Sequence, residues 1–449
     1  MEANAVAAIM IFLAVLVLLI LRPRNLNIAL IASVGAIAAL LLGVVTVIDA
    51  LNALLRIWDA ALAFIGIVTM SVTLDFMGFF RWIALRIAKM AGGDGLKLYI
   101  YTVILTAMVS ILFANDSCVL ILTPIVLEMV SAMGLTGDSR AAYLFGAGLI
   151  ADTAAMPLIT SNPVNIVSAD YFHYTFVQHF LFMGPVAAAT IPASIGIVYL
   201  FFRKKIPRTY SVNKINDLIE SCPRPLRLRG SVGVLVAIDI GYVFASFIGI
   251  PVSFIICSGA AVLVIMYATG YKQNQNFCAG KVGVRNIMKR VNWDILFFMI
   301  SIYLVVDGLR SAGAISFFSN LFASSVKLPG LLSTFVPSLI VTLGASAMNN
   351  WSMTMMGLIS IGSILPSLTA KSATSLIFSN IIGNNLGPHF FPLGSLAMLM
   401  WLGTMKRKGV TIRIRDYFKV GAVLSLAEVL IASLILWLEV AFLGMVLVL

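Results

Sequence analysis

The sequence has little charge. Only 11% of its 449 residues are Asp, Glu, Lys or Arg, whereas 61% are hydrophobic, and soluble globular proteins average about a quarter charged residues. The mean hydropathy of +1.05 agrees with that balance. Its apolar runs reach the length of about 20 residues that a membrane helix needs, and they lack the ten-residue alternation of a membrane β-barrel. We therefore predict an all-α integral membrane protein.

Cysteine, histidine and enzyme motifs are also scarce. There are four cysteines and three histidines, with no CxxC pair, so neither a disulfide framework nor a structural metal site is indicated. The chain has no phosphate-binding loop, HExxH or GxSxG motif. We expect no enzyme activity, no cofactor and no metal, so that energy for any transport must come from an ion gradient or a separate subunit.

Two apolar runs are too long for a single crossing. Residues 98–133 are divided by ANDS at 114–117, and residues 331–366 are divided by MNN at 348–350. An irregular polar segment at membrane depth is tolerated when it is buried in protein. We interpret each run as a re-entrant helical hairpin that turns back inside the membrane.

Two further runs are interrupted by polar segments that contain proline. Residues 141–170 include ITSNPVN at 159–165, and residues 372–402 include GNNLGP at 383–388. Proline removes a helical hydrogen-bond donor and clashes with the preceding turn. The alternative, two full spans joined by a polar loop, leaves most arms short for a crossing of about 20 residues. We predict two broken helices.

Basic residues give the orientation of the ten remaining spans, because cytoplasmic loops of membrane proteins are enriched in Lys and Arg. The segment 203–230 carries eight of them, so we place it in the cytoplasm. Alternation then puts both termini outside and leaves only four of the 30 basic residues there, namely Arg56, Arg310, Lys327 and Lys371. The net charge of +12 therefore reflects topology, and we expect no nucleic-acid partner.

The two halves of the chain repeat the same order of polar features. The pairs with similar spacing are Asp75 and Asp307, Asn115 and Asn349, and Asn162 and Asn384. Five crossings and one hairpin per half force the second half to be inverted relative to the first. We predict a first repeat over 1–202, a cytoplasmic linker over 203–230 and a second, inverted repeat over 231–449, with the two hairpin tips meeting near the membrane centre.

The four polar breaks predict the binding site. They contain amides and hydroxyls but no Lys or Arg, which favours a small neutral solute rich in hydroxyl groups, or a hard cation held by oxygen atoms. The candidate substrate-binding residues are Asn115, Ser117, Thr160, Ser161, Asn162, Asn349, Asn350, Ser352, Asn384 and Asn385.

Asp116 and Asp152 are the candidates for proton coupling. A carboxyl group at membrane depth is costly when ionised, so its environment can tune it to exchange a proton. A helix cap for Asp116 and a structural hydrogen bond for Asp152 remain alternatives.

The other titratable residues are weaker candidates. Asp75, Asp239 and Asp307 are expected to be helix-packing groups, and Glu128, Glu428 and Glu439 rank lower. Two histidines are expected on the outer surface, and one is a candidate neighbour of the site: these are His173 and His179, and His389.

Four strings carry a family resemblance: LFANDSCVLILTPI (112–125), ADTAAMPLITSNPVNIVSADYF (151–172), MNNWSMTMMG (348–357) and GNNLGPHFFPLGSLAMLMW (383–401). Over nearly its whole length the chain resembles the ArsB-type arsenite/antimonite efflux permeases of the ion transporter superfamily. The resemblance implies proton-coupled export of As(OH)₃ and Sb(OH)₃ across a bacterial inner membrane, so the outer side on which the basic residues place both termini is the periplasm. Paired hairpins that meet at the membrane centre favour alternating access. The resemblance also implies that a soluble arsenite-stimulated ATPase is a partner in some cases.

Two positions depart from the family pattern. Cys118 stands where a small residue is usual, and GNNLG replaces a segment that often contains Cys or Asp. Arsenic(III) prefers thiolates, but a lone thiol cannot form a three-sulfur site. A sodium/proton antiporter or sodium-coupled anion carrier of the same superfamily is the main alternative function, and a passive channel is the third.

Overall fold

The computed structural model describes residues 2–23, 26–211, 213–220, 228–273, 283–291, 293–311, 313 and 315–447. Within these ranges the chain is helical and forms no strand, apart from one isolated β-bridge between Asp94 and Thr209. Large apolar side chains are exposed on its outside, for example Leu41 and Phe247. Such a surface fits the lipid bilayer, and the chain is an all-α integral membrane protein.

The helices before the central loop are α1 (Glu2–Leu21), α2 (Ile28–Leu41), α3 (Val47–Phe76), α4 (Phe79–Met90), α5 (Gly95–Phe113), α6 (Asn115–Ala132), α7 (Gly137–Thr153), the 3-10 turn η2 (Ile159–Ser161), α8 (Pro163–Phe172), α9 (Phe176–Phe202) and α10 (Asn213–Glu220). Those that follow are α11 (Leu228–Ile248), α12 (Val252–Gln273), α13 (Arg285–Arg290), α14 (Trp293–Ser311), α15 (Ile315–Ser325), α16 (Leu332–Met348), α17 (Asn350–Ile364), η3 (Leu365–Ser367), α18 (Ala370–Phe390), η4 (Pro392–Gly394), α19 (Leu396–Arg407) and α20 (Ile414–Ala441). Residues 212 and 221–227 of the predicted linker lie outside the described residues.

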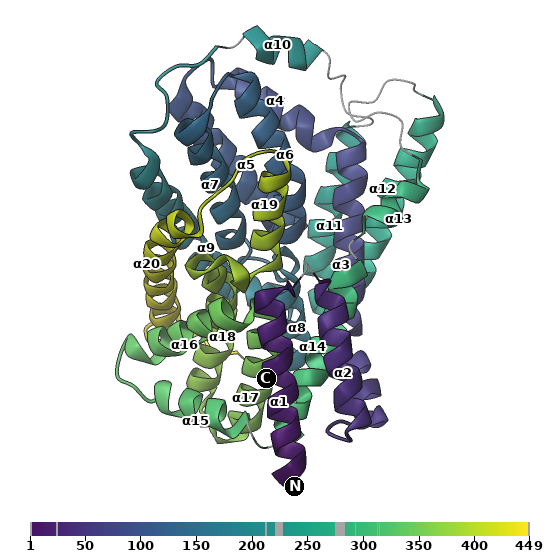
Figure 1. Ribbon diagram of the computed structural model, residues 1–449, viewed down its shortest axis with the longest axis vertical. Helices are drawn as coiled ribbons and strands as arrows, with labels where there is room; N and C mark the ends of the chain where they lie inside the picture. Colours follow the sequence, from purple (N-terminus) through teal and green to yellow (C-terminus); the bar gives the residue numbers. More distant parts are fainter. Residues whose placement is uncertain are drawn as a thin grey trace.

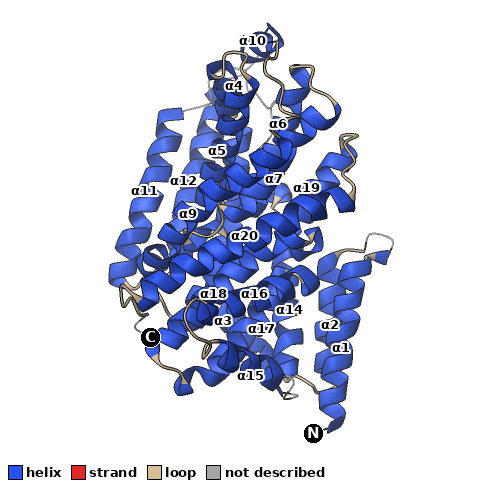
Figure 2. Cartoon of the chain, turned by 90° about the vertical axis from the view of Figure 1, so that its left-hand side faces the viewer, coloured by secondary structure: helices blue, strands red, loops and turns tan. Residues whose placement is uncertain are grey.

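The α5–α6 and α16–α17 pairs lie toward opposite ends of the molecule (Figures 1 and 2). Helix α6 packs on α7 and on α19, whereas α17 packs on α18 and on α8. Each pair therefore contacts the broken helix of its own half and the second segment of the broken helix from the other half.

Each of these pairs reverses direction at a single residue. Ala114 has φ 64° and ψ 149°, and Asn349 has φ 76° and ψ 146°. Only glycine adopts this region without steric cost, so both tips are strained. The turns fall within the polar segments at which the sequence predicts the hairpin tips.

The lengths of the helices do not decide whether each pair is a re-entrant hairpin or two full membrane spans. Eight helices of the described ranges are long and apolar enough to span a membrane, or nine if the bent pair α14 and α15 counts as one span. Helices α5 and α6 are both among the eight. Re-entrance therefore stays a prediction that rests on arrangement.

The first broken helix has the expected form, since α7 ends at Thr153 and α8 begins at Pro163. The expected break at GNNLGP is wrong, because α18 continues to Phe390 and the interruption follows at η4. Close packing on α16 explains the continuity: a Cβ at Gly387 would lie 2.8 Å from the Thr342 carbonyl oxygen. This backbone contact holds α18 helical although Pro388 removes one donor.

Helix α3 begins earlier than its apolar run suggests. Its first turn carries a capping box in which the Asp49 N–H donates to Thr46 Oγ1 (3.2 Å) and the Thr46 N–H donates to Asp49 Oδ2 (2.8 Å). The charged residues between 49 and 59 therefore belong to a helix rather than to a loop. One of them, Asp59, is buried and accepts a hydrogen bond from the Ser253 N–H (3.2 Å).

Candidate functional site

Asn115 joins the first hairpin tip to the first broken helix. It is the first residue of α6, and its Nδ2 donates to Asp152 Oδ1 on α7 at 2.8 Å. Its Oδ1 accepts from the Asp116 N–H at 2.9 Å. Both faces of the amide are used, so the side chain has one fixed orientation. Two of the predicted residues, Asn115 and Asp152, are thus in direct contact.

The two predicted proton-coupling carboxyls belong to the same cluster. Asp116 and Asp152 are both buried, and they are close enough for their charges to interact. Ionising both at once is unfavourable because like charges repel strongly where water is excluded. Asp116 also lies in the first turn of α6, where a negative charge is favourable. The pair is therefore suited to exchanging a proton.

Three asparagines connect the broken helices of the two halves. Asn162 Nδ2 donates to Asn385 Oδ1 at 2.9 Å, and Asn385 Nδ2 donates to Asn165 Oδ1 at 3.0 Å. Asn165 in turn donates to the Ala155 carbonyl oxygen at 2.9 Å, within the interruption between α7 and α8. All three side chains are buried. We call Asn162, Asn165 and Asn385 the amide clamp, because it fixes α8 against α18.

Several buried polar atoms near the second tip have no hydrogen-bond partner among the described residues. They lie on α17 and α18, which pack together so closely that a Cβ at Gly357 would be 2.1 Å from Asn380 Oδ1. Buried polar atoms are normally paired, so such a group is suited to a polar ligand. The atoms are Asn350 Oδ1, Ser352 Oγ, Thr354 Oγ1, Asn380 Nδ2 and Asn384 Oδ1.

The remaining predicted site residues are buried around these clusters. Ser117 lies in the first turn of α6, and Thr160 and Ser161 lie in η2. Ser161 Oγ donates to the Ile111 carbonyl oxygen of α5 at 2.7 Å. Asn349 Oδ1 caps α17 by accepting from the Trp351 N–H at 3.0 Å.

Equivalent hydrogen bonds anchor the two hairpins. Ser110 Oγ on α5 donates to the Ala151 carbonyl oxygen on α7, and Ser346 Oγ on α16 donates to the Gly387 carbonyl oxygen on α18. Donor and acceptor are 41 residues apart in both cases. The first arm of each hairpin is thus attached to its own broken helix in the same way.

Ser395 is a further residue at the second helix interruption, and it was not predicted from the sequence. Asn162 follows η2 and caps α8, and Ser395 follows η4 and caps α19 by accepting from the Met398 N–H at 3.3 Å. Ser395 therefore has the position after a 3-10 turn that Asn162 has in the first break, whereas Asn384 lies inside α18. Ser395 also lies beside Asp152. The signal was the string FPLGS, in which a Pro and Gly turn precedes a helix-capping serine.

Glu428 is a second residue that sequence reasoning ranked too low. It lies in the middle of α20, is fully buried, and its Oε2 is 2.7 Å from His389 Nδ1 on α18. Its Oε1 accepts hydrogen bonds from the Thr153 hydroxyl on α7 (2.6 Å) and from the Ser194 hydroxyl on α9. His389 was the expected neighbour of the site and does lie close to Asp152. This carboxylate therefore joins four helices beside the site.

The expected surface position of His179 is wrong. His179 is fully buried in the first turns of α9, where Nε2 is 2.9 Å from the Met156 carbonyl oxygen. A capping box formed by Thr175 and Gln178 starts α9 earlier than its apolar run suggests, which carries the histidine inside. His173 is exposed, as predicted.

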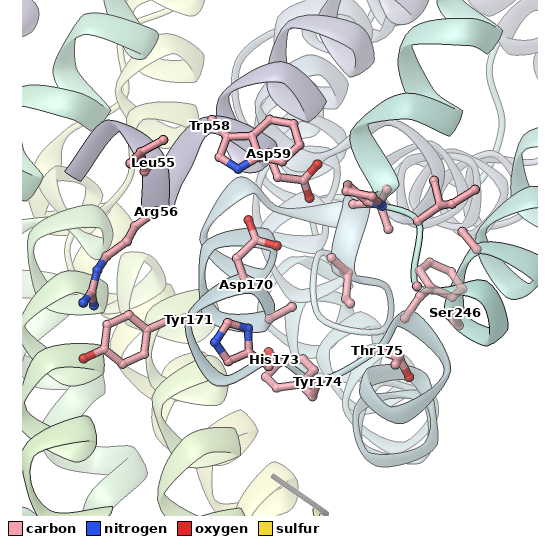
Figure 3. Close-up of a pocket in the computed structure, with 18 residues that line it drawn as sticks. Leu55, Arg56, Trp58, Asp59, Asp170, Tyr171, His173, Tyr174, Thr175 and Ser246 are labelled. Carbon is pink, nitrogen blue, oxygen red and sulfur yellow. The ribbon is translucent and has the colours of Figure 1, made fainter. Parts of the chain in front are cut away.

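A cavity of about 590 Å³ adjoins the first break. It is lined by Ile159 of η2 and by polar groups that include Arg56 and His173. Figure 3 shows that the carboxyl groups of Asp59 on α3 and Asp170 on α8, which line this cavity, point toward one another. A second cavity, of about 600 Å³, lies at the other end of α9. Thr160 and Ser161 belong to the same 3-10 turn as Ile159, so the first cavity adjoins predicted site residues.

The chain is an all-α membrane protein whose helices are interrupted by buried polar segments, an arrangement typical of membrane transporters. The model of the arsenical pump membrane protein family matches residues 7–439, and the chain belongs to this family.

Curated relatives cover nearly the whole chain. The arsenical pump membrane protein of Yersinia enterocolitica is 38% identical over 93% of this chain and 94% of its own length. One from Escherichia coli is 37% identical over 96% of this chain and 98% of its own. A putative arsenical pump membrane protein of Bacillus subtilis is 25% identical over 96% of this chain and 99% of its own.

Proposed function

We propose that this chain exports arsenite and antimonite as neutral trihydroxides in exchange for protons, by alternating access. The similarity to proteins named arsenical pump membrane proteins supports the substrate class. The observation that carries the proposal is the set of buried, unpartnered amide and hydroxyl atoms on α17 and α18. A neutral trihydroxide needs hydrogen-bond donors and acceptors and no countercharge, and these groups supply both.

The proposed substrate site includes all ten candidate residues, with different roles. Asn350, Ser352 and Asn384 carry unpartnered atoms on α17 and α18 and are proposed to contact the substrate. Asn162 and Asn385 are proposed to hold the broken helices in register, because their amides are engaged with each other. The others line the breaks; they are Asn115, Ser117, Thr160, Ser161 and Asn349.

Proton coupling is proposed to operate through Asp116 and Asp152. In the ionised state Asp152 accepts the hydrogen bond from Asn115, and protonation weakens that charge-assisted bond. The position of the first hairpin tip then depends on the proton. Because Asn115 also accepts from the Asp116 N–H, the change passes to the start of α6.

An inverted repeat is proposed to supply the alternating access. The equivalent tip conformations and serine anchors support it, as does the exchange of contacts in which α6 packs on α19 and α17 packs on α8. We propose that the segment 203–230 is cytoplasmic, that both termini are periplasmic in a bacterial inner membrane, and that a soluble arsenite-stimulated ATPase is an optional partner at the cytoplasmic face.

A sodium/proton antiporter or sodium-coupled anion carrier is the second candidate. The observation in its favour is that most of the unpartnered atoms are oxygens, which are the ligands that hard cations prefer.

Uptake of arsenite into everted membrane vesicles tests the proposal. The vesicles receive an imposed proton gradient, acidic inside, with no ATP and with or without sodium. We expect sodium-independent accumulation in the wild type and none in Asp116→Asn or Asp152→Asn, since each removes a titratable proton. Ser367→Ala, at an exposed turn, serves as the matched control. Sodium-dependent proton movement without arsenite uptake would instead support the second candidate.

A further inference from the structure

His389 and Glu428 form a fully buried pair whose hydrogen-bonding positions are all used. His389 Nδ1 faces Glu428 Oε2 at 2.7 Å, and Nε2 faces the Leu149 carbonyl oxygen at 2.9 Å. Glu428 Oε1 accepts from two hydroxyl groups, those of Thr153 and Ser194. Both residues have no exposed side-chain surface. The pair was not among the predicted site residues.

The pattern of donors and acceptors favours a charged pair. A carbonyl oxygen accepts only, so Nε2 of His389 must carry a hydrogen. Glu428 receives hydroxyl donors at one oxygen, and a third donor at the other oxygen stabilises its ionised form. Nδ1 then also carries a hydrogen, and the ring is an imidazolium. One proton lies between Nδ1 and Oε2, and it stays within the pair whether the ring or the carboxyl group holds it.

This cation lies beside the carboxyl group proposed to carry the transported proton. Leu149 and Thr153, which contact the pair, flank Asp152 on α7, and His389 and Asp152 interact electrostatically. Among the buried side chains of the described ranges only His179 could otherwise be cationic. The Nδ1 atom of His179 faces the Tyr174 hydroxyl at 3.4 Å, whereas Nδ1 of His389 faces a carboxylate. His389 is therefore the cation available to Asp152.

We propose that His389, held by Glu428, is a positioning residue for proton coupling: its imidazolium stabilises the ionised form of Asp152 and so permits Asp152 to release its proton inside the membrane. The inference rests on the proposed function and adds two residues to it. The proton that leaves is the one on Asp152, and the proton shared by His389 and Glu428 stays in place. The uncompensated carboxylate would otherwise carry a large desolvation cost.

The groups facing the pair support this assignment. Helix α7 contributes Asp152, α20 contributes Glu428 and Tyr417, and α9 contributes the Ser194 hydroxyl. Tyr417 donates its hydroxyl to the Pro388 carbonyl oxygen at 2.9 Å and stays neutral. Asp116 interacts with Asp152 from α6. None of these groups is a competing cation.

The test uses Glu428→Gln in everted vesicles. A glutamine accepts from Thr153 and Ser194 and donates to Nδ1 of a neutral His389, so the hydrogen bonds are kept while the charges are lost. We expect Asp152 to hold its proton more firmly. The bath pH that gives half-maximal arsenite uptake should then rise by about one unit, since a nearby opposite charge shifts a carboxyl by about 1–3 units.

Two further variants separate this role from a structural one. His389→Gln also removes the cation and is expected to shift the profile by at least as much. Ser425→Ala removes an uncharged hydrogen bond between α20 and α18, from Oγ to the Leu386 carbonyl oxygen at 3.0 Å. It is expected to keep the wild-type pH profile even if it lowers stability. Elution as a folded species in size-exclusion chromatography is the folding check for all variants.

The outcomes are distinct. Wild-type pH profiles in Glu428→Gln and His389→Gln, with uptake intact, would overturn the inference and leave the proposed function standing. An equal shift in Ser425→Ala would overturn it as well, because charge would then not be the cause. Absence of proton-driven uptake in wild-type vesicles would overturn the proposed function itself, before any substitution is made.

Discussion

Replacing Ala114 by glycine at the first hairpin tip is expected to stabilise the protein. Ala114 has φ 64° and ψ 149°, in a region that only glycine adopts without steric cost. A residue held there costs about 1–3 kcal/mol, and glycine removes that cost. Glycine also increases the freedom of the unfolded chain, which costs about 0.4–1 kcal/mol. The net gain in the free energy of unfolding is therefore about 0–2.6 kcal/mol.

The second tip provides a matched comparison. Asn349 has almost the same conformation, with φ 76° and ψ 146°, but its Oδ1 also caps α17 by accepting from the Trp351 N–H at 3.0 Å. Asn349→Gly removes the strain and the cap together. Loss of a cap costs about 0.5–2 kcal/mol, so the two effects nearly cancel. We expect a change within about 1 kcal/mol of zero.

Reversible unfolding by SDS in mixed micelles measures both variants against the wild type. The expected order of stability is Ala114→Gly first, followed by the wild type and Asn349→Gly at similar values. Loosening the tip is also expected to lower the transport rate of Ala114→Gly, because a strained, well-ordered site loses precision when the strain is relieved. A lower free energy of unfolding for Ala114→Gly than for the wild type would refute the strained-tip reasoning.

Three other substitutions separate structural from binding roles. Asn385→Ala breaks the amide clamp and leaves Asn162 without its acceptor, so we expect a loss of about 1–3 kcal/mol in the same unfolding assay. Asn384→Ala removes an oxygen without a hydrogen-bond partner among the described residues and also the two hydrogen bonds that Asn384 Nδ2 donates to Asn380. It should raise the arsenite concentration that gives half-maximal uptake, and it should lower the free energy of unfolding by about 1–3 kcal/mol. Gly421→Ala would place a Cβ 1.9 Å from the His389 carbonyl oxygen and should destabilise by about 1–3 kcal/mol, measured as a lower melting temperature.

The sequence predicted what a local pattern can encode. Polar residues in the middle of long apolar runs located both hairpin tips, because unpaired polar backbone is costly in a membrane. The shift of the second break from GNNLGP to η4 was not predictable from the proline, since contact between Gly387 and α16 keeps α18 helical. That contact is tertiary and leaves no trace in the local pattern.

The site residues that the sequence did not predict were missed for the same physical reason. Glu428 is a lone carboxyl group in an apolar helix, and its partners Thr153 and Ser194 are 275 and 234 residues away. No spacing rule connects them, so only the packed helices reveal that the charge is compensated. The contact between Asn115 and Asp152 was easier to anticipate, since Asn115 belongs to a predicted break and Asp152 to the helical arm that precedes another.

Proton movement in proteoliposomes tests the central claim most directly. The purified chain is reconstituted with a pH-sensitive dye inside, without ATP, sodium or any partner protein, and arsenite is added to one side. Our account predicts an arsenite-dependent proton flux in the opposite direction to arsenite movement, which Asp152→Asn abolishes. Arsenite movement with no accompanying proton flux in the wild type would contradict it.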